Sequence, residues 1–174
     1  MANLEKETDN NLEHKKKGLE EWLRNPANLL LVLVFLFVFS IRLYYFFITM
    51  HQPLWWDESE YMAGAKGFAG LVDYHLSSIR APGFSMTASL FFIAGIENEA
   101  ILRFFLCFLP SLIVLLLVYI CIKEMYPDRR IALISVLILS VLWEHLFYSY
   151  RFQTENMALL FEFLAIIILF KCYL

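Results

Sequence analysis

The feature that most constrains this chain is a series of long apolar runs separated by short polar segments. The first run extends from about Leu29 to Thr49, and a helix of about 20 residues is enough to cross a bilayer. Further apolar runs cover residues 82–96, 101–122, 131–147 and 156–174. Because 60% of the 174 residues are apolar and only 18% are charged, a chain of this length has too little interior to bury them. The composition therefore predicts an all-α membrane protein and excludes a soluble enzyme, a disordered tail, a disulfide-rich secreted domain and a nucleic-acid-binding protein.

The run over residues 82–96 decides the number of spans. Only about 14 residues lie between Pro82 and Glu97, fewer than a crossing requires, so this segment is expected to lie in the interface. About four transmembrane helices then remain, over residues 29–49, 101–122, 131–148 and 156–174. The last span ends at FKCYL without a polar tail, from which we expect a fragment, a split gene or one half of a larger assembly.

The placement of charge predicts the orientation. Lysines 15–17 in the polar arm (residues 1–28) fall on the same side as the basic turn KEMYPDRR if four spans are correct. The positive-inside rule places that side in the cytoplasm. The loop 50–100, with six acidic and two basic residues, then lies outside. We therefore expect a cytoplasmic arm over 1–28 and a multi-pass region over 29–174, located by default in a bacterial or archaeal plasma membrane.

The outer loop holds the residues best suited to chemistry. Asp57 and Glu58 follow a Trp-Trp pair and precede apolar residues at helical spacing, so two short juxtamembrane helices are expected in the loop. Asp57, with Glu60 three residues later, is close to a capping box. Asp57 would therefore either cap an interfacial helix or, held at the bilayer surface, act as a general base or bind a metal.

Three arginines stand near the same face. Arg80 precedes the second interfacial helix, where a guanidinium can pair with a phosphate or snorkel to lipid. Arg42 lies inside the first span and should face a protein interior or a cavity, or snorkel outward. Arg103 begins the second span and would pair with Glu97 or Glu99, or contact a ligand.

The start of the fourth span adds further acidic residues. Glu155 opens this span from the outer side, where an acid favours the helix dipole, and Glu162 lies seven residues later on the same face. Glu144 and His145, near the outer end of the third span, should form hydrogen bonds between helices or line a polar cavity. The topology brings residues of four elements to one face of the membrane, namely Asp57, Arg80, Arg103 and Glu155.

In their order and spacing these segments resemble the N-terminal module of the GT-C superfamily of membrane glycosyltransferases. The closest likeness is to the branch of protein O-mannosyltransferases and lipid A aminoarabinose transferases. The resemblance covers about 130–145 residues. It is carried by the Arg42 span, WWDESEYMAGAKGF, RAPGFSMTASLFFIAGIENEAILR, the turn PDRRIALISVLILS and the acid in RFQTENMALLF.

The resemblance implies a glycosyltransferase, or the N-terminal part of one, that acts on the extracytoplasmic face. The donor would be a sugar on a polyprenyl phosphate, and the acceptor a hydroxyl or amine of a protein, lipid or glycan. Asp57 would take the acceptor proton, while Arg80 would neutralise the departing phosphate. The implied site comprises the catalytic residues Asp57 and Glu58, the phosphate-binding residues Arg80 and Arg42, and the supporting residues Tyr61, Arg103 and Glu155.

Some points depart from that family or stay open. Several relatives carry a second acid just before the basic residue, where this chain has Ile79. Relatives also have many more spans, so a second chain that supplies helices is an expected partner beside membrane lipids. One Asp-Glu pair provides too few ligands to predict a metal. The alternatives are a non-catalytic membrane subunit or truncated paralogue, and a channel or transporter component, although the spans lack the paired Gly/Pro-broken helices of transporters.

Overall fold

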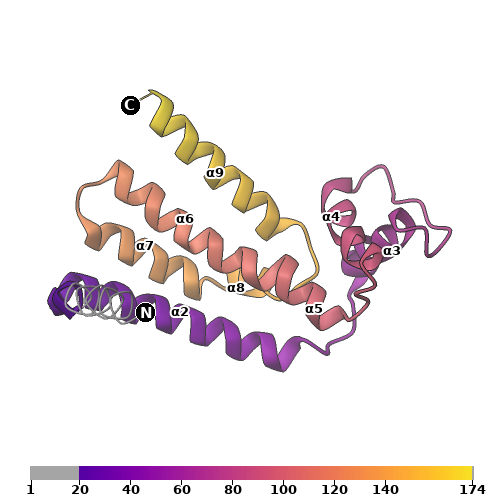
Figure 1. Cartoon of the computed structure of the whole chain (residues 1–174), viewed down its shortest axis with the longest axis horizontal. Helices are drawn as coiled ribbons and strands as arrows, with labels where there is room; N and C mark the ends of the chain where they lie inside the picture. The colour runs from indigo at the N-terminus through magenta and orange to yellow at the C-terminus, as the bar shows by residue number, and fades with distance from the viewer. Residues whose placement is uncertain (1–19, 174) are drawn as a thin grey trace, which may run out of the picture. The chain divides into compact units, whose positions relative to one another are not determined.

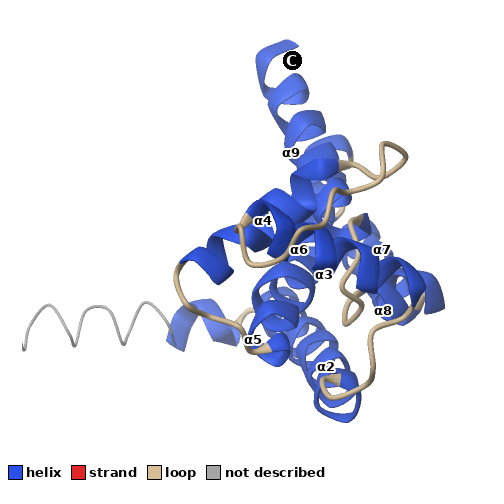
Figure 2. Ribbon diagram, turned by 90° about the vertical axis from the view of Figure 1, so that its right-hand side faces the viewer, coloured by secondary structure: helices blue, strands red, loops and turns tan. Residues whose placement is uncertain are grey.

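The computed structural model describes residues 20–173, and every regular element in that range is a helix. The cytoplasmic arm was predicted over residues 1–28, and its first 19 residues lie outside the described range. The chain divides into two compact units, Met1–Phe37 and Val38–Leu174. All contacts described below lie within the second unit. Figures 1 and 2 label the helices α2 (Pro26–Thr49), α3 (Trp56–Phe68), α4 (Pro82–Ile93), α5 (Glu99–Arg103), α6 (Leu109–Met125), α7 (Arg129–Val141), α8 (Trp143–Tyr148) and α9 (Glu155–Tyr173). A π-helical turn, η1 (Phe104–Phe108), lies between α5 and α6.

Two helices in the described range are long and apolar enough to cross a membrane. One is α2, with 24 residues, and the other is the continuous helix Glu99–Met125, with 27 residues. They correspond to the first and second predicted spans. The π-helical turn inside the second helix directly follows Arg103, and such turns frequently mark functional positions. Within the second unit, α6 packs against both α7 and α9.

The segment predicted as the third span, 131–148, is interrupted in the structure. Helix α7 ends at Val141, Leu142 is extended (φ −61°, ψ 122°), and α8 begins at Trp143. In a continuous helix the Ser140 carbonyl would accept the N–H of residue 144. Here it accepts a hydrogen bond from Arg42 Nη1 at 3.2 Å. The side chain of an arginine from α2 therefore satisfies a carbonyl that the break in the helix leaves free.

The loop between the first two candidate spans contains the two predicted helices, α3 and α4, which pack together. Proline at the first turn of α4 suits its start, because that position needs no N–H donor. Gly95, at φ 79°, lies just beyond its end. Gly67 allows the loop to lie against α3, because a Cβ there would come within 2.2 Å of the Tyr74 carbonyl oxygen.

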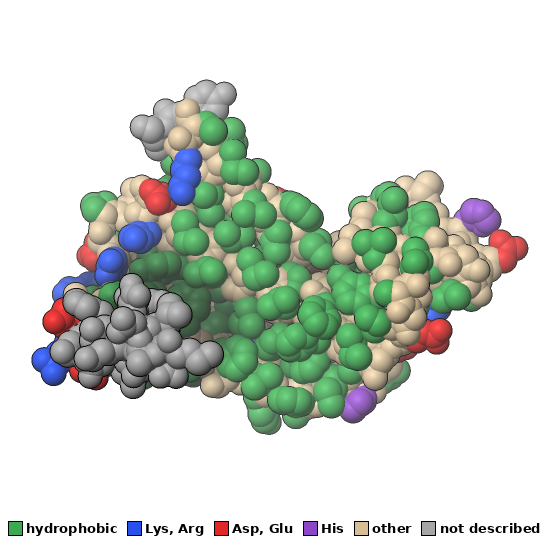
Figure 3. Space-filling view, viewed as in Figure 1, with side chains coloured by type: hydrophobic (Ala, Val, Ile, Leu, Met, Phe, Trp, Pro, Cys, Tyr) green, Lys and Arg blue, Asp and Glu red, His purple; other side chains and the backbone are tan. Residues whose placement is uncertain are grey.

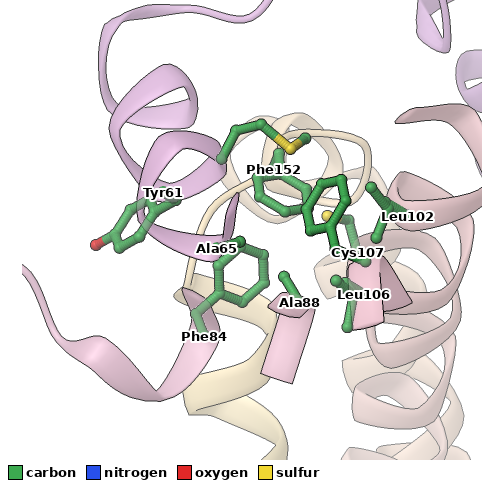
Figure 4. Packing of buried hydrophobic residues seen from close by; sticks show 10 residues of the cluster. Tyr61, Ala65, Phe84, Ala88, Leu102, Leu106, Cys107 and Phe152 are labelled. Atoms are coloured by element: carbon green, nitrogen blue, oxygen red, sulfur yellow. The ribbon is translucent and has the colours of Figure 1, made fainter. Parts of the chain in front are cut away.

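A buried apolar cluster joins α3 and α4 to the long helix and to the segment before α9 (Figure 4). Phe152 is completely buried, and its ring lies 4.8 Å from that of Phe84, edge to face. Tyr61 packs on Phe84 at 5.6 Å. The members of the cluster are Tyr61, Met62, Ala65, Phe84, Ala88, Phe92, Leu102, Leu106, Cys107 and Phe152. This packing fixes the face of α3 that carries the polar residues described next.

Candidate functional site

Asp57, Glu60, Tyr61 and Arg80 form a polar cluster at the start of α3, here named the Arg80 cluster. Arg80 Nη2 donates to Asp57 Oδ1, and Arg80 Nε donates to Glu60 Oε2 at 2.7 Å. The guanidinium carbon lies 5.7 Å from the centre of the Tyr61 ring. Positions 57, 60 and 61 share one helix face because residues three and four apart are neighbours. The two residues predicted to act as base and phosphate ligand are therefore in direct contact.

The Arg80 cluster is open to solvent. The Asp57 side chain is 42% exposed and that of Arg80 is 25% exposed. Hydrogen bonds from Arg80 to Glu60 and to Asp57 raise the pKa of Arg80 above its ordinary value, so the guanidinium stays charged. Two carboxylates share one cation, which leaves a net negative charge that a ligand can reach.

A cavity of about 600 Å³ adjoins the cluster, and Arg80 forms part of its wall. The other walls are the C-terminal half of α3 and the loop 72–78, which contributes hydroxyl, phenol and imidazole groups. Ligand pockets in proteins commonly have volumes of about 300–1,000 Å³. The cavity is therefore large enough for a small polar ligand that reaches Arg80.

Glu58 does not occupy the catalytic position that the sequence predicted for it. Its side chain is fully buried. Both oxygens accept a backbone N–H at 2.7 Å, Oε2 from Trp55 and Oε1 from Phe152. Arg151 Nη1 donates to Oε2 at 3.2 Å, and Arg103 Nη1 lies 3.6 Å from Oε1. Glu58 therefore joins α3 to the segment before α9 and to the long helix, and it cannot reach an acceptor.

The capping prediction for Asp57 and Glu60 is also wrong, by two residues. Helix α3 begins at Trp56, so Trp55 is the N-cap residue and Glu58 is the third helical residue. The Glu58 carboxylate accepts the Trp55 N–H, as the acidic member of a capping box does. The helix begins earlier because the buried arginines hold Glu58 in the interior. Asp57 is thus released from capping, and its carboxylate pairs with Arg80.

Arg103 pairs with neither of the two acids that the sequence suggested. Glu97 and Glu99 are exposed, whereas Arg103 is fully buried and donates to the backbone carbonyls of Gln52 and Tyr150, each at 3.1 Å. Its closest carboxylate is that of Glu58. Arg103 supports the site from the interior, since its side chain has no exposed surface for a ligand.

Sequence reasoning missed Arg151. Its guanidinium carbon lies 3.9 Å from the centre of the Trp55 ring, and the side chain is almost fully buried beside Glu58. The available signal was an arginine in the seven-residue turn 149–155, which the four-span topology places on the same outer face as Trp55 and Trp56. Because Arg151 stacks on Trp55 and pairs with Glu58, it holds the turn before α9 in place and is not exposed to solvent.

Arg42 faces the protein interior, one of the alternatives that the sequence left open, and it is not part of the Arg80 cluster. It is fully buried, and its donors reach the Ser140 carbonyl and Nδ1 of His145. No hydrogen bond or ion pair joins it to Arg80 among residues 20–173. The predicted role of Arg42 as a ligand of the donor phosphate therefore lacks the position it requires.

Glu155 is the first residue of α9. Its Oε2 is buried and accepts no hydrogen bond from the described residues. Of the four residues predicted to converge, Asp57 and Arg80 are in direct contact. Arg103 lies beside Glu58 in the interior, and no hydrogen bond or ion pair in the described range joins Glu155 to the other three.

No group of three or more His, Cys, Asp or Glu side chains within the described range is arranged to hold a metal ion. Comparison with known protein families, with curated proteins and with solved structures found no match to this chain. Every regular element among residues 20–173 is thus a helix, and two of these helices are long and apolar enough to favour a membrane location.

Proposed function

We propose that the chain is a multi-pass membrane protein with four crossings and an outer loop over residues 50–100. The crossings would be α2, the helix Glu99–Met125, the broken pair α7–α8, and α9. Large apolar side chains cover much of the surface (Figure 3). On α7 and α9 several are more than half exposed, which suits contact with lipid, namely Ile134, Ile138, Phe161 and Ile168.

The break at Leu142 is compatible with this arrangement. Inside a bilayer each free backbone carbonyl is costly unless protein groups satisfy it. Arg42 supplies that hydrogen bond to Ser140, and a buried arginine that faces other helices is the expected form of a charge within a span. The α7–α8 pair can therefore form one crossing despite its interruption.

For the function, we propose transfer of a sugar from a polyprenyl-phosphate donor to an acceptor on the outer face, by this chain alone or together with a second chain. The observation that carries this proposal is the direct pair of Asp57 and Arg80 at an open, polar surface. The order of motifs that resembles the GT-C superfamily is the second support. The cell membrane is the proposed location.

The resting contacts indicate how the cluster would work. An incoming donor phosphate competes with Asp57 and Glu60 for the Arg80 guanidinium, which can hold a phosphate by two hydrogen bonds. Release of Asp57 leaves its carboxylate free to take the proton of the acceptor hydroxyl or amine. The acceptor forms a bond to the anomeric carbon, the bond from that carbon to the phosphate oxygen breaks, and Arg80 stabilises the charge of the departing polyprenyl phosphate.

The test is transfer of labelled hexose and pentose from polyprenyl-phosphate donors by the chain in native membranes. Asp57→Asn should lower turnover by about 100-fold or more, the usual contribution of a general base. Glu97→Gln, a matched change at an exposed acid of the same loop, should leave turnover unchanged. A correctly inserted Asp57→Asn protein with the turnover of the wild type would overturn the proposal.

The second candidate is a non-catalytic membrane subunit. It is favoured by the pairing of Arg80 with two carboxylates, since this ion-pair network can simply join α3 to the loop two residues before α4. On this alternative Asp57→Asn would reduce the amount of α3–α4 structure or of partner bound, and transfer by the assembled protein would fall only in proportion to that loss.

A further inference from the structure

Glu162 places an ionisable side chain near the middle of the proposed fourth crossing. It belongs to α9, a helix of 19 residues, and lies about 10 Å along the helix axis from Glu155 and about 16 Å from Tyr173. Glu162 is exposed, and no hydrogen bond or ion pair within residues 20–173 reaches its carboxylate. Inside a bilayer such a side chain is costly unless it faces protein or a water-filled cavity. Its exposure therefore indicates that this face of α9 is covered by something other than lipid tails.

The Glu162 carboxylate borders a cavity of about 370 Å³ among α7, α8 and α9, here named the α9 groove. Leu142, Glu144 and Ala158 also line this cavity and are exposed, so it opens at the surface. Ala158 precedes Glu162 by one turn of the same helix face. A few side chains of a neighbouring helix can fill a space of this size.

The α9 groove carries acidic charge without a counter-charge. Glu144 from α8 and Glu155 and Glu162 from α9 line it, and no lysine or arginine of the described part of the chain is in its wall. The remaining wall is mostly apolar and includes Leu139 and Leu159. Lipid tails supply no positive charge, so the partner that complements this groove is an apolar surface that brings a cation to the depth of Glu162.

A second copy of this chain does not offer such a surface within residues 20–173. The exposed basic residues of its proposed crossings lie at their ends, namely Lys123, Arg129, Arg130 and Lys171. Arg42 and Arg103 lie deeper but are fully buried. A symmetric contact through the groove would also bring its carboxylates close to the same carboxylates of the other copy.

We propose that the α9 groove is the docking site for a transmembrane helix of a different chain, which carries a lysine or arginine near the middle of its span. The cation pairs with Glu162, and the apolar wall packs against the side chains one turn on either side of it. This inference rests on the proposed crossing by α9 and not on sugar transfer. If transfer also holds, the docked helix belongs to the second chain that assembles with this one.

The experiment offers the full chain, in liposomes of neutral lipid, three synthetic leucine-rich transmembrane peptides that differ only in a central arginine, leucine or glutamate. Each peptide carries a benzophenone beside its central residue, and the cross-linked residues are identified by mass spectrometry. The arginine peptide should cross-link to α7, α8 or α9 at a peptide-to-lipid ratio about tenfold lower than the leucine peptide, the effect of one polar contact between helices. Equal cross-linking by all three peptides would overturn the proposal. Preference for the glutamate peptide would do so too, because it would indicate pairing of protonated carboxyl groups.

Matched variants separate the groove from general helix contact. Glu162→Leu should reduce cross-linking by the arginine peptide to the level of the leucine peptide, whereas Glu97→Gln, at an exposed acid of the outer loop, should keep the tenfold preference. Ala158→Trp fills the groove and should lower cross-linking by both peptides. Leu164→Trp places the same side chain on the opposite face of α9 from Glu162, outside the groove, and should keep the wild-type pattern.

Three further results would overturn the proposal. The first is an arginine preference that survives in Glu162→Leu. The second is energy transfer between two differently labelled copies of the chain that is lost in Ala158→Trp, which would assign the groove to a second copy. The third is a Glu162→Cys variant, in a chain without other cysteines, that reacts with a water-soluble maleimide as fast as Glu97→Cys does, because the crossing by α9 would then fail as well.

Failure of this proposal can be distinguished from failure of the transferase function. An arginine preference in a protein whose Asp57→Asn variant transfers sugar normally would retain the docking site and remove the transferase assignment. Loss of transfer in Asp57→Asn, together with equal cross-linking by the three peptides, would retain the transferase and remove the docking site.

Discussion

Glu58 offers the sharpest test of how the site is held together, because its buried carboxylate is the centre of four contacts. Replacement by glutamine conserves size but removes the charge that faces Arg103 and Arg151. Both arginines are almost fully buried, and loss of one member of a buried ion pair costs about 3–5 kcal/mol. The glutamine must also turn a donor NH₂ toward one of the two backbone N–H groups that now point at the carboxylate, which leaves that group without an acceptor.

The expected loss for Glu58→Gln is therefore at least about 3 kcal/mol, a large part of the 5–15 kcal/mol that keeps a typical domain folded. The assay is unfolding in mixed detergent micelles, followed by tryptophan fluorescence, since Trp55 stacks on Arg151. Glu97→Gln is the matched control at an exposed acid and should lie within about 0.5 kcal/mol of the wild type.

A double variant sharpens the result. Glu58→Gln with Arg103→Met removes one of the stranded charges and should recover part of the loss, because the cost arises mainly from an unpaired buried cation. If Glu58→Gln unfolds at the same detergent fraction as Glu97→Gln, the buried network does not hold α3 in place, and our account of the site's construction fails.

Two further predictions concern other parts of the chain. Gly67→Ala should destabilise by about 1–3 kcal/mol, because its Cβ would meet the Tyr74 carbonyl, whereas Gly83→Ala has open space and should be tolerated; detergent unfolding compares them. A single cysteine at Asp128, placed by Asp128→Cys in a chain without other cysteines, should react with an impermeant reagent only from the cytoplasmic side, and outside labelling would contradict the four crossings.

The helices of the outer loop were predictable from local sequence. The short apolar run after Pro82 and the polar, Trp-flanked start of the other helix both determine their own boundaries within a few residues. The proximity of Asp57 and Arg80 was also within reach, because both lie in one outer loop and Arg80 is one of only two basic residues there. Local spacing and composition suffice for contacts of this kind.

The buried contacts of the site could not be predicted, because they depend on residues far away in the sequence. Asp57 and Glu58 are adjacent, and nothing local decides which one turns inward. That choice depends on Arg151, 93 residues later in the chain. The break at Leu142 likewise has no proline or glycine to announce it, and its carbonyl partner Arg42 lies 98 residues away from Ser140. The inward position of Glu58 and the helix break at Leu142 therefore depend on buried arginines far away in the sequence, which local patterns cannot reveal.

The central claim is that Asp57 and Arg80 form the reacting pair of a polyprenyl-phosphate-dependent sugar transferase. The most direct measurement is single-turnover transfer from a labelled polyprenyl-phosphate sugar by wild type and Asp57→Asn, with the amount of inserted protein matched. We predict that the chemical step slows by about 100-fold or more in the variant, while donor binding persists because Arg80 is intact. Equal single-turnover rates in the two proteins would contradict the account.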